Sequence, residues 1–158
     1  MSKQILLTQG KVAIVDDGDY RYLNQWKWLA AKQGNTWYAH RAIRIDGKQQ
    51  ILSMHRLLMP TTGEALIDHI DRDGLNNQRS NLREATVSQN QMNSVSHANS
   101  SSKYKGVSWH KRRKAWQVNV LRKSYGYFDS EVEAALEYNK VAPILFGEFA
   151  RLNIVKEE

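Results

Sequence analysis

Short apolar runs separated by turn-forming residues characterise the first part of the chain. Their length and their content of β-branched and aromatic residues predict strands at Ile5–Leu7, Val12–Val15, Trp37–Ile45 and Ile51–Leu58. Asp17-Gly18 and Asp46-Gly47 are typical of hairpin turns between such strands. Tyr20–Ala31 has apolar residues at helical spacing, which predicts a short helix or an irregular turn.

A polar stretch with a different order of elements lies in the middle, at Leu66–Asn93. A short strand at 65–70 carries Asp68 and His69, a turn-rich loop covers 71–80, and a second short strand covers 82–85. Thr86-Val87-Ser88-Gln89 has the pattern of a capping box, which opens a helix. The predicted order is therefore strand, loop, strand, helix.

The last third predicts a small sheet covered by one helix. Ser94–Ser102 is rich in Ser and Asn and is typical of a flexible linker. Ser130-Glu131-Val132-Glu133 is a capping box, and Gly147 is a natural helix end. The three short strands that precede this helix are expected at Tyr104–Trp109, Trp116–Leu121 and Ser124–Phe128. Together the patterns predict an α+β protein whose final part is a three-stranded antiparallel sheet packed on one helix.

Charge and composition narrow the class of partner. The 158 residues include 23 Lys and Arg against 16 Asp and Glu, a net charge of +7, which favours a polyanion. Lys103–Tyr125 holds eight basic residues and no acidic one, the convergence of cations that phosphate neutralisation requires. No apolar run approaches the roughly 20 residues needed to cross a bilayer, so we expect no membrane partner and a cytoplasmic location. Since the chain has no cysteine, disulfides and thiolate zinc sites are excluded.

Four polar residues of the middle stretch have the chemistry needed to hydrolyse a phosphodiester: Asp68, His69, Asn81 and Asn90. A neutral imidazole accepts a proton from water near neutral pH. A carboxylate and an amide oxygen bind a hard divalent cation, and a second amide fixes the imidazole tautomer. Taken by itself, an adjacent Asp-His pair is more often structural than catalytic.

The stretch DHIDRDGLNNQRSNLREATVSQN, at 68–90, resembles the cysteine-free HNH nuclease motif of phage and homing endonucleases, and Met54–Leu58 resembles the segment that precedes it. The resemblance implies a ββα-metal unit with His69 as general base, Asn81 orienting it, and Asp68 and Asn90 as ligands of Mg²⁺ or Mn²⁺. Asn93 or His97 are alternatives to Asn90. It also implies double-stranded DNA as partner, no organic cofactor, a monomer or homodimer, and a phage-encoded protein acting in a bacterial host cell.

The last third resembles the AP-two (APETALA/ethylene-response-factor) DNA-binding domain, in which a three-stranded sheet lies in the major groove. The similar segments are KYKGV at 103–107, WQV at 116–118, YGYFD at 125–129 and FARLN at 149–153. Ser108 and Leu121 stand where the plant members typically carry arginine, so the plant target sequence does not transfer. The resemblance assigns DNA contacts to Lys105, His110, Lys111, Arg112, Arg113, Lys114, Trp116, Gln117, Asn119, Lys123 and Tyr125.

These features predict four segments. Residues 1–53 form a β-rich segment that packs on the nuclease, 54–94 form the HNH unit, 95–102 form the linker, and 103–153 form the AP-two-like domain. The predicted function is a sequence-directed, metal-dependent DNA endonuclease of the HNH homing type. The alternatives are a non-catalytic DNA-binding regulator that keeps the HNH unit as a scaffold, and an RNA-binding protein.

Overall fold

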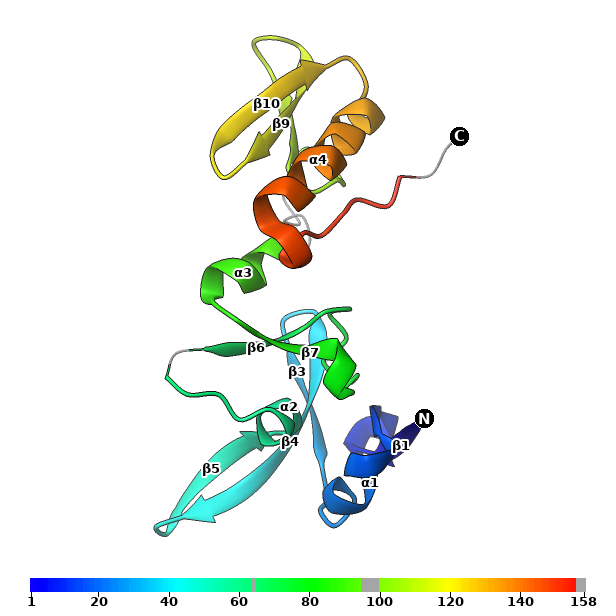
Figure 1. The fold of residues 1–158 in the computed structure, drawn as a ribbon, viewed down its shortest axis with the longest axis vertical. Helices are drawn as coiled ribbons and strands as arrows, with labels where there is room; N and C mark the ends of the chain where they lie inside the picture. The colour runs from blue at the N-terminus through cyan, green and yellow to red at the C-terminus, as the bar shows by residue number, and fades with distance from the viewer. Residues whose placement is uncertain (64, 95–99, 156–158) are drawn as a thin grey trace. The chain divides into compact units, whose positions relative to one another are not determined.

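The structure, a computed structural model, describes residues 1–63, 65–94 and 100–155. It confirms the α+β class, with helices and several small antiparallel sheets in two compact units, Met1–Ser88 and Gln89–Glu158 (Figure 1). His97 and most of the predicted linker lie outside the described residues. Within the described residues, no helix combines the length and the hydrophobicity needed to cross a membrane.

The first unit opens with a two-stranded sheet. Strand β1 (Ser2–Leu6) leads through the short 3-10 turn η1 (Thr8–Gly10) to its antiparallel partner β2 (Val12–Asp16), and helix α1 (Asp17–Leu23) follows directly. The hairpin turn expected at Asp17-Gly18 is therefore wrong. Asp17 and Asp19 instead lie in the first turn of α1, where carboxylates stabilise the helix dipole.

A second sheet in this unit has the order β3 (Leu29–Gln33), β4 (Thr36–Ile45), β5 (Lys48–Ser53). The turn at Asp46-Gly47 is confirmed, since both residues have positive φ, 49° and 75°, and join β4 to β5. The strand expected over Ile51–Leu58 is wrong in its second half, which forms helix α2 (Met54–Leu58). One helical turn places Met54 and Leu58 on the same side, and both are buried.

The predicted order of strand, loop, strand and helix is present. Strand β6 (Leu66–His69) pairs antiparallel with β7 (Leu82–Ala85), and between them lie the loop 70–78 and the 3-10 turn η2 (Arg79–Asn81). Helix α3 (Val87–Met92) follows β7. The core of the unit joins these elements to the N-terminal ones, through buried residues that include Ile5, Val15, Leu23, Trp28, Met54, Leu58 and Leu82.

The second unit contains the predicted sheet and helix. Strands β8 (Val107–His110), β9 (Ala115–Val120) and β10 (Lys123–Phe128) have the order β10-β9-β8. Helix α4 (Glu131–Phe146) packs on this sheet and is followed by the 3-10 turn η3 (Gly147–Phe149) (Figure 1). The Ser130 hydroxyl accepts hydrogen bonds from Val132 N and Glu133 N, as expected of the cap. Small residues on α4 and valines on β9 form the buried interface: Val118, Val120, Ala134, Ala135 and Ala142.

Candidate active site

Asp68 and His69 are placed side by side by the end of β6. The register pairs Asp68 with Arg83 and His69 with Leu82 across the β6–β7 sheet. Leu82 is buried in the core, so the pairing anchors this end of the strand. Asp68 and His69 are each only 5% exposed, and both polar side chains therefore depend on partners within the protein.

The Asp68 carboxylate forms a buried ion pair with Arg83. Nε and Nη2 of Arg83 donate to Oδ2 of Asp68 at 3.0 and 2.8 Å. The two side chains are 5% and 11% exposed, so solvent screens this pair little. Arg83 neutralises the carboxylate and sets its direction.

Rings from two other elements pack against the His69 imidazole. Its centroid lies 5.1 Å from that of His55 on α2 and 5.8 Å from that of Tyr38 on β4. Burial lowers the pKa of His69, while Asn77 and the carboxylates of Asp71, Asp68 and Asp73 act in the opposite direction. A lowered pKa keeps the imidazole neutral at neutral pH, the form that accepts a proton from water.

The neighbouring His55 imidazole is also held neutral. Burial lowers its pKa to about 3, and the neighbouring His69, Arg56 and His40 add to this effect. Two neutral imidazoles therefore lie in contact beside Asp68.

The loop 70–78 is held internally by Asn81. Its Nδ2 donates to Asp71 Oδ1 and to Asn76 O, both at 2.8 Å, and its Oδ1 accepts from Asp71 N at 3.0 Å. Asn77 in the same loop is fully buried, and its effect is to raise the pKa of His69 against the lowering by burial. The role expected of Asn81, orienting His69, stays a prediction.

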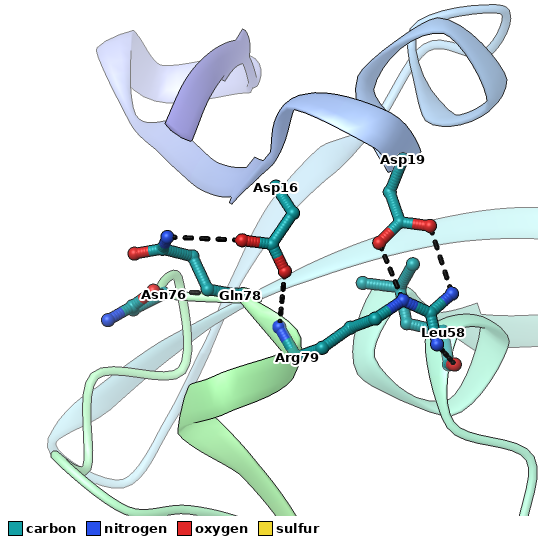
Figure 2. A network of polar contacts seen from close by, with 6 residues as sticks. All are labelled: Asp16, Asp19, Leu58, Asn76, Gln78 and Arg79. Carbon is teal, nitrogen blue, oxygen red and sulfur yellow. Dashed lines mark hydrogen bonds and ion pairs between the residues drawn. The ribbon is translucent and has the colours of Figure 1, made fainter. Parts of the chain in front are cut away.

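The far end of the loop is tied to the N-terminal elements (Figure 2). Arg79 donates to both carboxylate oxygens of Asp19, at 2.8 and 2.9 Å, and to Leu58 O at 3.0 Å. Asp16 accepts from Arg79 N at 2.8 Å and from Gln78 Nε2 at 3.2 Å. The predicted packing of the N-terminal segment on this region thus has specific polar contacts.

A recess of about 400 Å³ opens beside the loop. Its lining includes Lys11, Trp37, Asp71, Arg72 and Asp73. Arg72 has φ +68° and its amide donates to His69 O at 2.8 Å, so the recess adjoins the end of β6. Its lining therefore brings cationic, anionic and aromatic groups close to the end of β6, the strand that carries His69.

The outward face of the second unit's sheet is polar and partly aromatic. Gln117 donates to Ser124 Oγ at 3.1 Å and to Tyr127 OH at 3.2 Å, and Asn119 donates to Ser108 Oγ at 3.4 Å. The Arg113 guanidinium lies 4.4 Å from the centroid of the Tyr127 ring. His110 also contacts this ring, with centroids 5.2 Å apart.

Three of the expected DNA contacts occupy other positions. Trp116 and Tyr125 pack partly against the core of the unit. Lys105 directs its ammonium group at the end of α3, where it donates to Gln91 O at 3.2 Å, to Ser94 O at 2.8 Å and to Met92 O. The expected DNA contacts Lys111, Arg112 and Lys114 lie exposed in the β8–β9 turn.

Comparison with known proteins identifies the family. Residues 62–92 match the HNH endonuclease family. An HNH endonuclease from Acanthamoeba polyphaga mimivirus, described as uncharacterized, is 32% identical over 152 residues, which cover 92% of this chain and 76% of that protein. The chain belongs to the HNH endonuclease family. No solved structure matches it.

The HNH endonuclease family is a family of phosphodiesterase nucleases, and membership implies DNA as the substrate. The HNH match covers Asp68, His69, Asn81 and Asn90, and it ends before the sheet of the second unit. The relative comes from a virus of an amoeba, and the expected phage origin and the AP-two resemblance stay predictions.

HNH nucleases generally use a divalent metal, and the donor types present here suit one. Carboxylate and amide oxygens, as in Asp68 and Asn90, are preferred by hard cations. Asn90 lies exposed on α3, whereas Asn93 is only 6% exposed. Within the described residues, no three His, Asp or Glu side chains are grouped so as to hold a metal ion.

Sequence reasoning did not identify Arg83 and Tyr38 as neighbours of Asp68 and His69. A basic residue in the second strand of the motif is a weak signal, because the register of β6 and β7 cannot be read across a long loop. Tyr38 lies on a distant strand and has no local signal at all.

Proposed function

We propose that this protein is a divalent-metal-dependent DNA endonuclease of the HNH homing type, directed to its site by the C-terminal sheet. The observation that carries the nuclease assignment is a buried, neutral His69 beside Asp68 at the end of β6, inside the family-matched segment. In this assignment residues 1–94 cut and residues 103–153 bind duplex DNA.

The roles follow from the chemistry of each group. His69 accepts the proton of the attacking water, because a neutral imidazole has a free lone pair at neutral pH. Asp68 and Asn90 hold the cation, with Asn93 and His97 as the alternatives to Asn90. When bound, the cation supplies positive charge to the phosphate and to the leaving oxygen. Lys11 and Arg72 in the recess give cationic contacts for the DNA strand next to the scissile bond.

The test is cleavage of supercoiled plasmid with Mg²⁺ or Mn²⁺. We expect nicked product from wild type, none with a chelator, and none from His69→Ala, while the gel-shift affinity of His69→Ala stays unchanged. His40→Gln is the control, because His40 is a buried histidine of the same unit and is not the proposed base. Nicking by His69→Ala would overturn the assignment, and a wild type that binds but never cuts would favour the non-catalytic regulator.

DNA binding by the C-terminal sheet is supported by the position of its charges. The β8–β9 turn presents Arg112, Arg113 and Lys114, and the sheet face beside it presents His110, Gln117 and Asn119. Lys123 is exposed at the start of β10, where it pairs with Val120 across the sheet. Arginine, lysine and amide side chains suit phosphates and base edges. A β surface of this kind can enter the major groove.

Replacing Arg112, Arg113 and Lys114 with alanine tests this assignment. We expect weaker duplex binding and a flatter salt dependence, with the log–log slope reduced by about 0.9 for each phosphate that the variant no longer neutralises. Lys140→Ala is the matched control, because Lys140 is a surface lysine on α4, where it pairs with Glu137 at 3.2 Å. Equal affinity and equal salt slope in the triple variant would exclude this turn as a DNA-binding element.

A further inference from the structure

Helix α3 carries Asn90 but has few means of its own to stay folded. It is six residues long, and none of these residues, all of which the structure describes, is buried. Helices shorter than about 12–15 residues are marginal in water unless packing supports them, and the last four carbonyls of any helix lack partners within it. The last turn of α3 also lacks a basic residue that could bond to these carbonyls. The helix therefore needs a partner from another part of the chain.

The ammonium group of Lys105 supplies that partner at the end of α3. It donates to Gln91 O at 3.2 Å, to Ser94 O at 2.8 Å and to Met92 O. An ammonium group has three N–H donors, so this one side chain can satisfy all three carbonyls. Its positive charge also stabilises the negative end of the helix dipole. Lys105 is thus a C-terminal cap of α3.

The backbone of Lys105 is fixed to the sheet and the helix of the second unit. Lys105 N donates to Asn153 Oδ1 at 2.7 Å, and Asn153 Nδ2 donates back to Lys105 O at 3.1 Å. Asn153 forms a second reciprocal pair with Asn139 on α4, at 2.9 and 2.7 Å. The carbonyl of the next residue, Gly106, accepts from Asn119 N on β9 at 2.8 Å. Lys105 therefore connects the end of α3 to the sheet and to α4.

We propose that Lys105 is a positioning residue that caps α3 and fixes this helix, with its amide ligand of the cation, to the proposed DNA-binding sheet. Asn90 lies on α3, and the alternative ligand Asn93 follows the helix and donates from its N to Gln89 O at 3.3 Å. The bonds to the three carbonyls use the donors that the AP-two resemblance assigns to DNA. The inference rests on the proposed function, because Asn90 or Asn93 must bind the cation for the position of α3 to matter.

The test compares Lys105→Met, Lys105→Arg and Lys103→Met in the full chain. Methionine keeps an unbranched side chain without the charge, whereas arginine keeps both a charge and several donors. Lys103→Met is the matched control, because Lys103 is an exposed lysine of the same segment whose Nζ lies 5.1 Å from the centroid of the Tyr104 ring. The measurements are amide hydrogen exchange at residues 89–94, calorimetric titration of Mn²⁺ without DNA, gel-shift affinity at several salt concentrations, and plasmid nicking against Mg²⁺ concentration.

We expect the amides of residues 89–94 to exchange about tenfold faster in Lys105→Met, because the uncapped helix opens more often. The affinity for Mn²⁺ should fall about tenfold, the lower end of the loss typical of removing a group that holds a metal ligand in place. Lys105→Arg should recover most of both effects, and Lys103→Met should show neither. Duplex affinity and its salt slope should be equal in Lys105→Met and Lys103→Met.

Nicking separates a loss of metal affinity from a loss of DNA contacts. In Lys105→Met the Mg²⁺ concentration that gives half the maximal rate should rise about tenfold, with the rate at saturating Mg²⁺ and the KM for plasmid within about twofold of wild type. A rise in the KM for plasmid with an unchanged Mg²⁺ requirement would contradict the inference.

Three further outcomes would overturn it. Unchanged exchange at residues 89–94 in Lys105→Met would show that Lys105 does not hold α3. Faster exchange with unchanged Mn²⁺ affinity would make the cap merely structural. A salt slope lower than that of Lys103→Met by about 0.9 would make Lys105 a phosphate contact. If wild type does not cut DNA, the proposed function fails, and hydrogen exchange still decides whether Lys105 caps α3.

Discussion

The buried histidine His55 makes a quantitative prediction about acid stability. Its pKa is lowered from 6.5 to about 3 in the folded protein, first by burial and then by His69, Arg56 and His40. As the pH falls below 6.5 the unfolded chain binds a proton at this position before the folded chain does, so stability decreases with falling pH down to about 3. Each pH unit in that window costs about 1.4 kcal/mol, so His55 removes about 2 kcal/mol between pH 6.5 and pH 5.

The assay is urea unfolding of the first unit at pH 7, 6 and 5, in wild type and in His55→Leu, with each protein compared with its own value at pH 7. Burial also lowers the pKa of His69 and His40. The free energy of unfolding of wild type should therefore fall by somewhat more than the contribution of His55 alone. Between pH 7 and pH 5, the free energy of unfolding of His55→Leu should fall by about 2 kcal/mol less than that of wild type. His110→Leu, in the second unit, leaves the His55 contribution in place and is the control.

A direct measurement can refute the reasoning. The ring protons of His55 should not titrate between pH 8 and pH 5 in the folded protein. A midpoint near 6.5, or an equal pH dependence in wild type and His55→Leu, would show that the ring is solvated.

Two further substitutions test the packing around the site and in the second unit. Arg83→Leu should lower the free energy of unfolding by about 3–5 kcal/mol at pH 7, because it removes the guanidinium that pairs with the buried Asp68 carboxylate. A loss below about 1 kcal/mol in chemical denaturation would contradict a buried pair. Gly106→Ala should destabilise the second unit, because φ is +74° and the added Cβ would fall 2.2 Å from the Tyr138 ring; an unchanged melting temperature of that unit would contradict this packing.

Much of the fold was predictable because its signals are local. Asp46-Gly47 predicted a turn correctly, since both residues tolerate positive φ and hydrophobic strands flank them. The same dipeptide type at Asp17-Gly18 failed, because the chain after β2 continues into a helix that packs Leu23 into the core. Ile51–Leu58 failed in its second half for a related reason: a short apolar run fits a strand or a buried helical turn, and only the packing of Met54 and Leu58 decides.

The candidate site, too, was predictable only in part from the sequence. Adjacent Asp68 and His69 in a short strand, with amides downstream, were visible in the sequence and lie within the family-matched segment. The contacts of the loop amides were not visible, because only the path of the loop brings Asn81 against Asp71 and Asn76. The choice of Arg83 as the partner of Asp68 likewise needed the register of β6 and β7.

The sequence by itself determined which chemical groups this protein has and on which local elements they lie: a carboxylate and an imidazole at the end of a strand, amides after it, and an acid-free basic sheet at 103–125. Only the tertiary structure decided the state of those groups. Tyr38, His55 and His69 come from β4, α2 and β6, and their packing is what removes water from the imidazoles and lowers their pKa. Burial depends on neighbours far apart along the chain, so no local pattern could report it.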